Sequence, residues 1–110
     1  MIQTRSNFDN CIVHSAIQKN GWPYDDGDVL YLKKYIEQGL QSVVEEYYYR
    51  SERIIAKIRE LDLDNQETWN DIDKKHVEGI IDCIKNDNYV DVTVKIREML
   101  GNLEQQYGVR

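Results

Sequence analysis

The chain has 110 residues, of which 41% are hydrophobic and 31% are charged, and 20 acidic against 14 basic side chains give it a net charge of −6. This size and balance are typical of one globular domain over residues 1–110 and exclude a disordered tail. No apolar run approaches the roughly 20 residues that a membrane span needs, and the first residues do not resemble a signal peptide. Because Cys11 and Cys83 are too few for a disulfide framework, we expect a cytoplasmic protein.

The acidic residues are concentrated in the segment 60–91, where ten of them face only Lys74, Lys75 and Lys85. An acidic surface repels phosphate backbones and anionic lipid, and it attracts basic proteins. The charge pattern therefore argues against direct binding of nucleic acid or membrane and favours a basic protein partner.

The first predicted helix covers residues 8–19, where apolar residues recur with helical spacing. Asn20-Gly21 gives it a strong stop, because both residues tolerate the left-handed conformation that ends helices. A loop over residues 22–27 follows, with Pro23 and Gly27 as breakers. The second helix is predicted to begin near Asp28, whose side chain can cap it.

This second helix is predicted to be one long helix that reaches Leu61. Its apolar residues step by three and four, which places them on one side of a helix. Unbroken, it would be about 50 Å long at 1.5 Å per residue, which is long for so small a domain. Two alternatives therefore stay open: the helix bends near Gly39 or at Tyr47–Tyr49, or a helix of another chain covers its apolar side. The stripe consists of Val29, Leu32, Ile36, Leu40, Val43, Tyr47, Ile54, Ile58 and Leu61.

A third helix is predicted after a turn at residues 61–65. Asp64, followed three residues later by Glu67, resembles a capping box, in which two side chains satisfy amides at a helix start. Asn86-Asp87-Asn88 ends the helix. Its apolar face holds Trp69, Ile72, His76, Val77, Ile80, Ile81 and Ile84.

The last segment carries two patterns. Residues 90–96 alternate valine or isoleucine with polar residues, as in a strand. On the helical reading, Tyr89, Val92, Ile96, Met99, Leu103 and Tyr107 share one face. Because nowhere else offers a clear second strand, we favour the helix. The predicted class is all-α, a small bundle of about four helices including one long helix, with α+β as the alternative if residues 89–97 form a strand.

Four side chains have the chemistry of zinc ligands: Cys11, His14, His76 and Cys83. Zinc takes four such ligands in a tetrahedron, but the paired spacings of a structural site are missing. Buried cysteines more often serve as small apolar residues. The chain also lacks a glycine-rich phosphate loop, a nucleophile elbow and a His-Glu-x-x-His pair. We therefore predict no metal, no cofactor and no enzymatic activity.

Tyrosine is abundant, with eight residues in the chain. Tyr47, Tyr48 and Tyr49 cannot all point inward on one helix, since each step rotates the side chain by about 100°. At least one of them should therefore be exposed. Tyrosine is enriched at binding surfaces, although tyrosines at the edge of a helical core are also ordinary.

These observations predict an acidic protein-binding module that masks a basic partner, as inhibitors, immunity proteins, antitoxins and anti-defence factors do. The likeness to those classes is one of charge and size alone. The alternative is a self-associating structural or regulatory module that forms a homodimer through the Val29–Leu61 helix. The predicted contact residues are Asp62, Asp64, Glu67, Trp69, Asp71, Glu78, Asp82, Tyr48 and Tyr49.

Overall fold

The computed structural model describes residues 7–39 and 44–109, and all regular structure in these residues is helical. The predicted all-α class is confirmed. In chain order the α-helices are α1 (Ile12–Lys19), α2 (Asp26–Lys34), α3 (Val44–Glu60), α4 (Gln66–Ile72), α5 (Glu78–Lys85) and α6 (Tyr89–Tyr107). A 3-10 turn over Asn7–Asn10 precedes α1, and π-helical segments extend α2 over Tyr35–Gly39 and join α4 to α5 over Asp73–Val77. Among the described residues, no helix combines the length and apolar character required to cross a bilayer.

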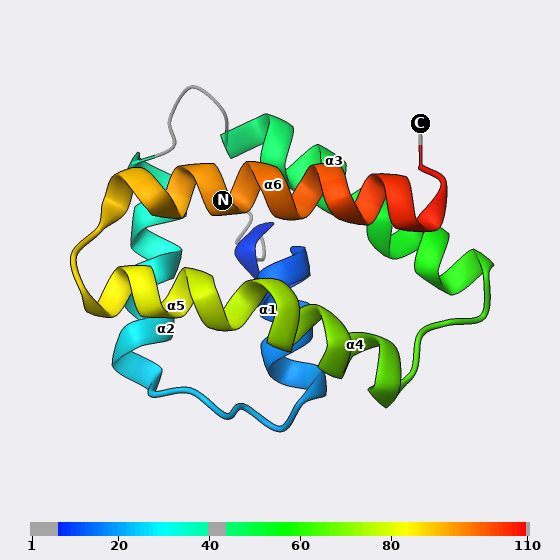
Figure 1. Cartoon of the computed structure of the whole chain (residues 1–110), viewed down its shortest axis with the longest axis horizontal. Coiled ribbons are helices and arrows are strands. Elements are labelled where there is room, and N and C mark those ends of the chain that lie inside the picture. The colour runs from blue at the N-terminus through cyan, green and yellow to red at the C-terminus, as the bar shows by residue number, and fades with distance from the viewer. Residues whose placement is uncertain (1–6, 40–43, 110) are drawn as a thin grey trace, which may run out of the picture.

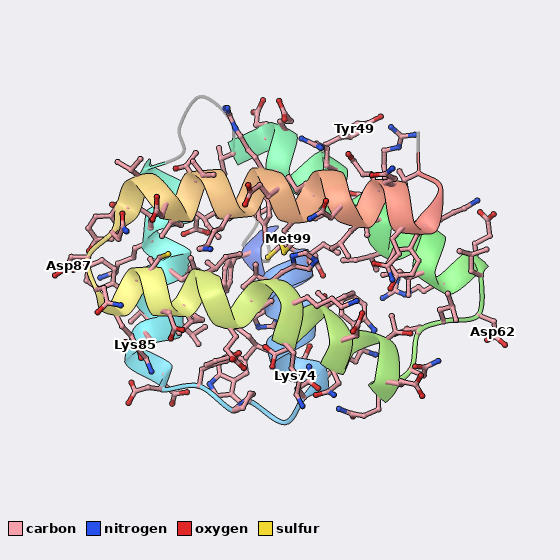
Figure 2. All side chains as sticks on the ribbon, viewed as in Figure 1. Tyr49, Asp62, Lys74, Lys85, Asp87 and Met99 are labelled. Atoms are coloured by element: carbon pink, nitrogen blue, oxygen red, sulfur yellow. The ribbon has the colours of Figure 1, made fainter. Side chains whose placement is uncertain are left out.

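The helices enclose one hydrophobic core around the short α1. Figure 1 shows α4 and α5 as one rod beside α6, with α3 behind α6 and α2 crossing the far end of the rod. α1 packs against α3 and α4, while α5 packs against both α2 and α6. The four apolar residues of α1, which are Ile12, Val13, Ala16 and Ile17, are all fully buried. Met99 of α6 points into the centre of the molecule (Figure 2).

The helix ends depend on local capping. Asn20 and Gly21 end α1 as predicted, and Gly21 has the left-handed φ of 77°. α2 begins at Asp26, earlier than the predicted start near Asp28. The cap is Asp25, whose carboxylate accepts a hydrogen bond from the backbone N–H of Gly27 at 2.7 Å. The prediction of Asp28 as the cap is therefore wrong.

The predicted long helix is wrong as a single straight element. α2 and α3 run in different directions (Figure 1), because α2 packs against α5 whereas α3 packs against α6. The residues Leu40 and Val43 of the predicted stripe lie outside the described residues. α3 ends at Glu60, so Leu61 falls in a turn and is 44% exposed. The other stripe residues, which are Val29, Leu32, Ile36, Tyr47, Ile54 and Ile58, are buried within the chain.

The third predicted helix is the α4–α5 rod, and its start differs from the prediction. Asn65, and not Asp64, is the cap, and its side chain accepts a hydrogen bond from the backbone N–H of Thr68 at 2.9 Å. Ile72 and Val77, five residues apart, are both buried, because the π-helical segment between them closes a wider turn. The rod ends at Lys85, followed by the predicted stop.

The ambiguous last segment is the helix α6, so the strand alternative for residues 89–97 is wrong. Val90 and Val94 are 77% and 48% exposed, whereas Val92 and Ile96 are buried. Alternate valines therefore do not share one face. The helical set of apolar residues forms the inner face, and Asn88 caps the helix.

Candidate functional site

The acidic segment does not form one continuous surface. Asp62, in the turn between α3 and α4, and Asp87, in the turn between α5 and α6, lie at opposite ends of the molecule (Figure 2). Asp73 is only 6% exposed and belongs to the interior. The concentration of charge along the sequence is therefore divided between two ends, the core and the outer face of the α4–α5 rod.

Asp64 and Trp69, two of the predicted contact residues, are used by the fold. Trp69 is 1% exposed and donates a hydrogen bond from its indole Nε1 to Asp64 Oδ1 at 2.7 Å. The Asp64 carboxylate also lies 3.4 Å from Lys19 Nζ and 3.6 Å from Arg59 Nε. The hydrogen bond from Trp69, helped by the two cations, lowers the pKa of Asp64. Trp69 is thus a core residue and not a surface anchor.

The predicted acids of the rod differ in how they are paired. Asp71 lies 3.2 Å from Lys75 Nζ one turn ahead, which offsets its charge. Glu67, Glu78 and Asp82 are exposed and have no ion-pair partner in the part of the chain that the structure describes. These three carboxylates remain available to a partner.

The packing of α2 against α5 adds further acids that the sequence interpretation treated as turn and cap residues. Asp25 and Asp26, at the start of α2, are exposed, and Asp26 accepts a hydrogen bond from the indole Nε1 of Trp22. Asp28 lies 3.9 Å from Lys85 Nζ of α5, which places the start of α2 beside the end of α5.

Tyr24 connects this loop to the rod. Its hydroxyl donates a hydrogen bond to Asp73 Oδ1 at 2.7 Å. Burial raises the pKa of Tyr24, and the negative charges of Asp73, Glu78 and Asp82 raise it further, so the hydroxyl stays protonated. Glu78 and Asp82 lie between Asp73 and Lys85 on the rod, and the contacts of those two residues with Tyr24 and Asp28 place the start of α2 along this part of the rod. We name the carboxylates gathered here the acidic face: Asp25, Asp26, Asp28, Glu78 and Asp82.

The predicted tyrosine contacts lie elsewhere. Tyr47 is buried, Tyr48 is half-buried and Tyr49 is 61% exposed, which confirms that the three cannot all point inward. The Arg53 guanidinium lies 5.5 Å from the centroid of the Tyr49 ring. In Figure 2, Tyr49 lies across the molecule from Lys74 and Lys85 of the rod. The nine predicted contact residues are therefore not one surface.

A cluster of aromatic residues between α2 and α6 was not predicted as a site. The ring centroids of Tyr35 and Tyr89 are 5.2 Å apart, and those of Tyr31 and Tyr89 are 6.1 Å apart. They line a groove of about 640 Å³ together with Leu30, which is 53% exposed. The one-turn spacing of Tyr31 and Tyr35 is visible in the sequence. The contribution of Tyr89 depends on how α6 packs, so the sequence does not show it.

The four potential zinc ligands have separate surroundings. Cys11 is fully buried, and burial raises the pKa of its thiol to about 11. His14 packs between the rings of Phe8 and Trp22, while His76 lies beside Lys75, and both burial and that lysine lower its pKa. Among the described residues, no group of three or more histidine, cysteine, aspartate and glutamate side chains could hold a metal ion.

No family model, curated protein or solved structure matches this chain. We therefore derive a function from its packing and surface chemistry alone. The acidic face includes two of the predicted contact residues, Glu78 and Asp82, and both are exposed.

Proposed function

We propose that the chain is an acidic protein-binding module that binds a basic partner through the acidic face, as an inhibitor, immunity protein, antitoxin or anti-defence factor does. The observation that carries this proposal is the packing of α2 on α5. It gathers carboxylates from two segments that are distant in sequence onto one surface. Lys85 is paired with Asp28 there, and the acids outnumber the lysines.

The surroundings of the acidic face favour protein recognition. Carboxylates speed the encounter with a basic partner, and aromatic side chains supply contact area once the partner has docked. Trp22, 37% exposed, provides such a side chain beside Asp26. The hydrogen bond from Tyr24 to Asp73 fixes the loop before binding, which reduces the entropy lost on association. A basic site that binds nucleic acid would be blocked, because its lysines and arginines would face carboxylates in place of phosphates.

The test reverses charge on the acidic face only. We would immobilise the wild type, the triple variant Asp26→Lys/Glu78→Lys/Asp82→Lys, and a control with three reversals outside the acidic face, Glu45→Lys/Glu60→Lys/Glu98→Lys. Circular dichroism and thermal melts would first establish that all three fold. A basic protein captured from the source lysate by the wild type and by the control, but not by the triple variant, is the expected result.

The affinity of the purified partner then gives the decisive number. Each reversed contact is expected to cost about 1 kcal/mol, so the triple variant should bind about 100-fold more weakly, and added salt should weaken the wild type. Equal affinity for the wild type and the triple variant would refute the acidic face as the binding surface.

The alternative, a self-associating module, is supported by a different surface from the Val29–Leu61 stripe, whose described residues other than Leu61 are covered within the chain. Leu30 and Tyr31 are each 53% exposed and line the groove next to Tyr89. A homodimer through this groove would bury them. Light scattering of the wild type and of Tyr31→Glu tests it, and a wild type that stays monomeric at high concentration would exclude it.

A further inference from the structure

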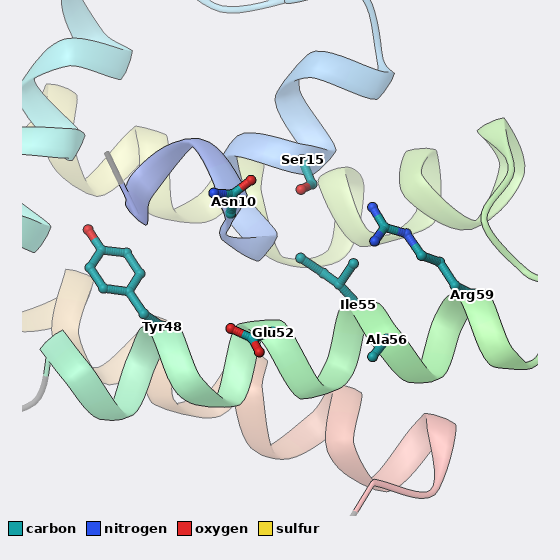
Figure 3. Close-up of a pocket in the computed structure, with 7 residues that line it drawn as sticks. All are labelled: Asn10, Ser15, Tyr48, Glu52, Ile55, Ala56 and Arg59. Atoms are coloured by element: carbon teal, nitrogen blue, oxygen red, sulfur yellow. The ribbon is translucent and has the colours of Figure 1, made fainter. Parts of the chain in front are cut away.

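A second surface feature is a cleft between α3 and the segment that leads into α1. It has a volume of about 350 Å³, within the range of small-ligand sites. Five residues of α3 line one side, which are Tyr48, Glu52, Ile55, Ala56 and Arg59, and Asn10 and Ser15 line the other. Figure 3 shows Glu52 opposite Asn10, and Arg59 extending towards Ser15. The buried Ile55 lies between the two charged residues and forms an apolar base.

Several polar groups of this cleft are not used by the fold. Within the described ranges, the side chains of Asn10, Ser15 and Glu52 make no hydrogen bond or ion pair. The buried hydroxyl of Tyr48 also has no partner there. Arg59 has only one contact, from Nε to Asp64 at 3.6 Å, and its side chain is 67% exposed. Asn10 and Glu52 are exposed to water, and the buried Tyr48 hydroxyl is the group of this cleft that a bound ligand would newly satisfy.

The two charged residues of the cleft have opposite sign and lie at different ends of it. Glu52 and Arg59 are seven residues apart on α3, which is two turns, or about 10.5 Å along the axis. A carboxylate at one end accepts hydrogen bonds from an ammonium group, and a guanidinium at the other donates two parallel hydrogen bonds to a carboxylate.

We propose that the cleft binds a short zwitterionic ligand. Its ammonium group lies against Glu52 and its carboxylate against Arg59. The hydroxyl of Ser15 and the amide of Asn10 hydrogen-bond the polar backbone of the ligand, and Ile55 packs beneath it. This site is on the α1–α3 side of the molecule and is independent of the acidic face.

Triglycine is the probe that tests the proposal, because it carries the two termini and no side chain. We would titrate the ¹⁵N-labelled protein with triglycine and follow the backbone amide signals of Ser15 and Ala56. Saturable shifts at these residues are expected. N-acetyl-triglycine lacks the ammonium group and triglycine amide lacks the carboxylate, so each should bind about tenfold more weakly.

Two variants assign each end of the ligand. In Glu52→Gln, triglycine and N-acetyl-triglycine should bind equally. In Arg59→Gln, triglycine and triglycine amide should bind equally. Glu45→Gln on α3 and Arg97→Gln on α6 lie outside the cleft and should retain the wild-type affinities. The proposal is overturned if triglycine gives no saturable shifts, if the blocked peptides bind as tightly as triglycine, or if the two cleft variants keep both preferences.

Discussion

The contact between Arg50 of α3 and Glu104 of α6 allows a quantitative prediction of the coupling free energy between the two side chains. Arg50 donates hydrogen bonds from Nε at 2.8 Å and from Nη2 at 2.6 Å to the two oxygens of the carboxylate. Both side chains are 24% exposed, so solvent screens the pair only in part. Exposed ion pairs contribute about 0.2–1 kcal/mol, and hydrogen bonds to charged groups about 1.5–3 kcal/mol. We therefore expect a coupling free energy of about 1–2 kcal/mol between these residues at neutral pH.

The pH dependence of this coupling has a definite sign. The hydrogen bond from Arg50 lowers the pKa of Glu104 below its ordinary value of 4.5. Because the folded state has the lower pKa, the pair contributes its full stability above pH 4.5. This contribution is lost as the pH falls through the lowered pKa of the folded state.

A double-mutant cycle with Arg50→Gln and Glu104→Gln measures the coupling from urea denaturation. For a chain of this size, the loss should also lower the melting temperature by about 4–8 °C. Glu46→Gln is the matched control, because Glu46 pairs with Arg50 at 2.9 Å but its side chain is 57% exposed, so it should cost less than about 0.5 kcal/mol. A coupling below about 0.5 kcal/mol at neutral pH, or one that persists in acid, would refute the reasoning.

Three further predictions concern single residues. Tyr24→Phe removes the hydroxyl that donates to the buried carboxylate of Asp73, and it should lower the free energy of unfolding by about 1–3 kcal/mol in urea denaturation. Asn65→Ala should lower the free energy of unfolding by about 1 kcal/mol in the same assay, whereas Glu67→Ala should change it by less than about 0.5 kcal/mol. A larger effect of Glu67→Ala would instead support the capping box predicted from the sequence. The buried thiol of Cys11, with its pKa raised to about 11, should resist iodoacetamide in the native protein and react after unfolding, as mass spectrometry would show.

Helices were predicted well where one face alone decides burial. In α6 the alternating pattern and the helical pattern both fitted, and the buried Val92 and Ile96 beside the exposed Val90 show that core packing selected the helix. For the predicted long helix, the sequence left open a bend near Gly39 or at Tyr47–Tyr49 and could not decide between them. Its apolar stripe continues with helical spacing past Gly39, and only the different packing partners of its two halves separate them.

The candidate site depended even more on distant contacts. Asp64 and Asn65 are both good capping residues, and the sequence could not show that the indole of Trp69 would engage Asp64 and leave the cap to Asn65. The exposed Glu78 and Asp82 follow from helical spacing. Their grouping with the start of α2 requires the contact between α2 and α5, and the sequence carries no local signal for it.

The π-helical segment Asp73–Val77 also fixes the direction in which the rod presents its charges. Its wider turn acts as one extra residue, so α5 is rotated by about a quarter turn relative to its direction in an uninterrupted α-helix. The rod can thereby face α1 at one end and both α2 and α6 at the other. The deletion of one residue here would rotate Ile80 and Ile84 off the core and carry Glu78 and Asp82 around with them. The orientation of the acidic face is thus set by the length of a backbone turn and not by the acids themselves.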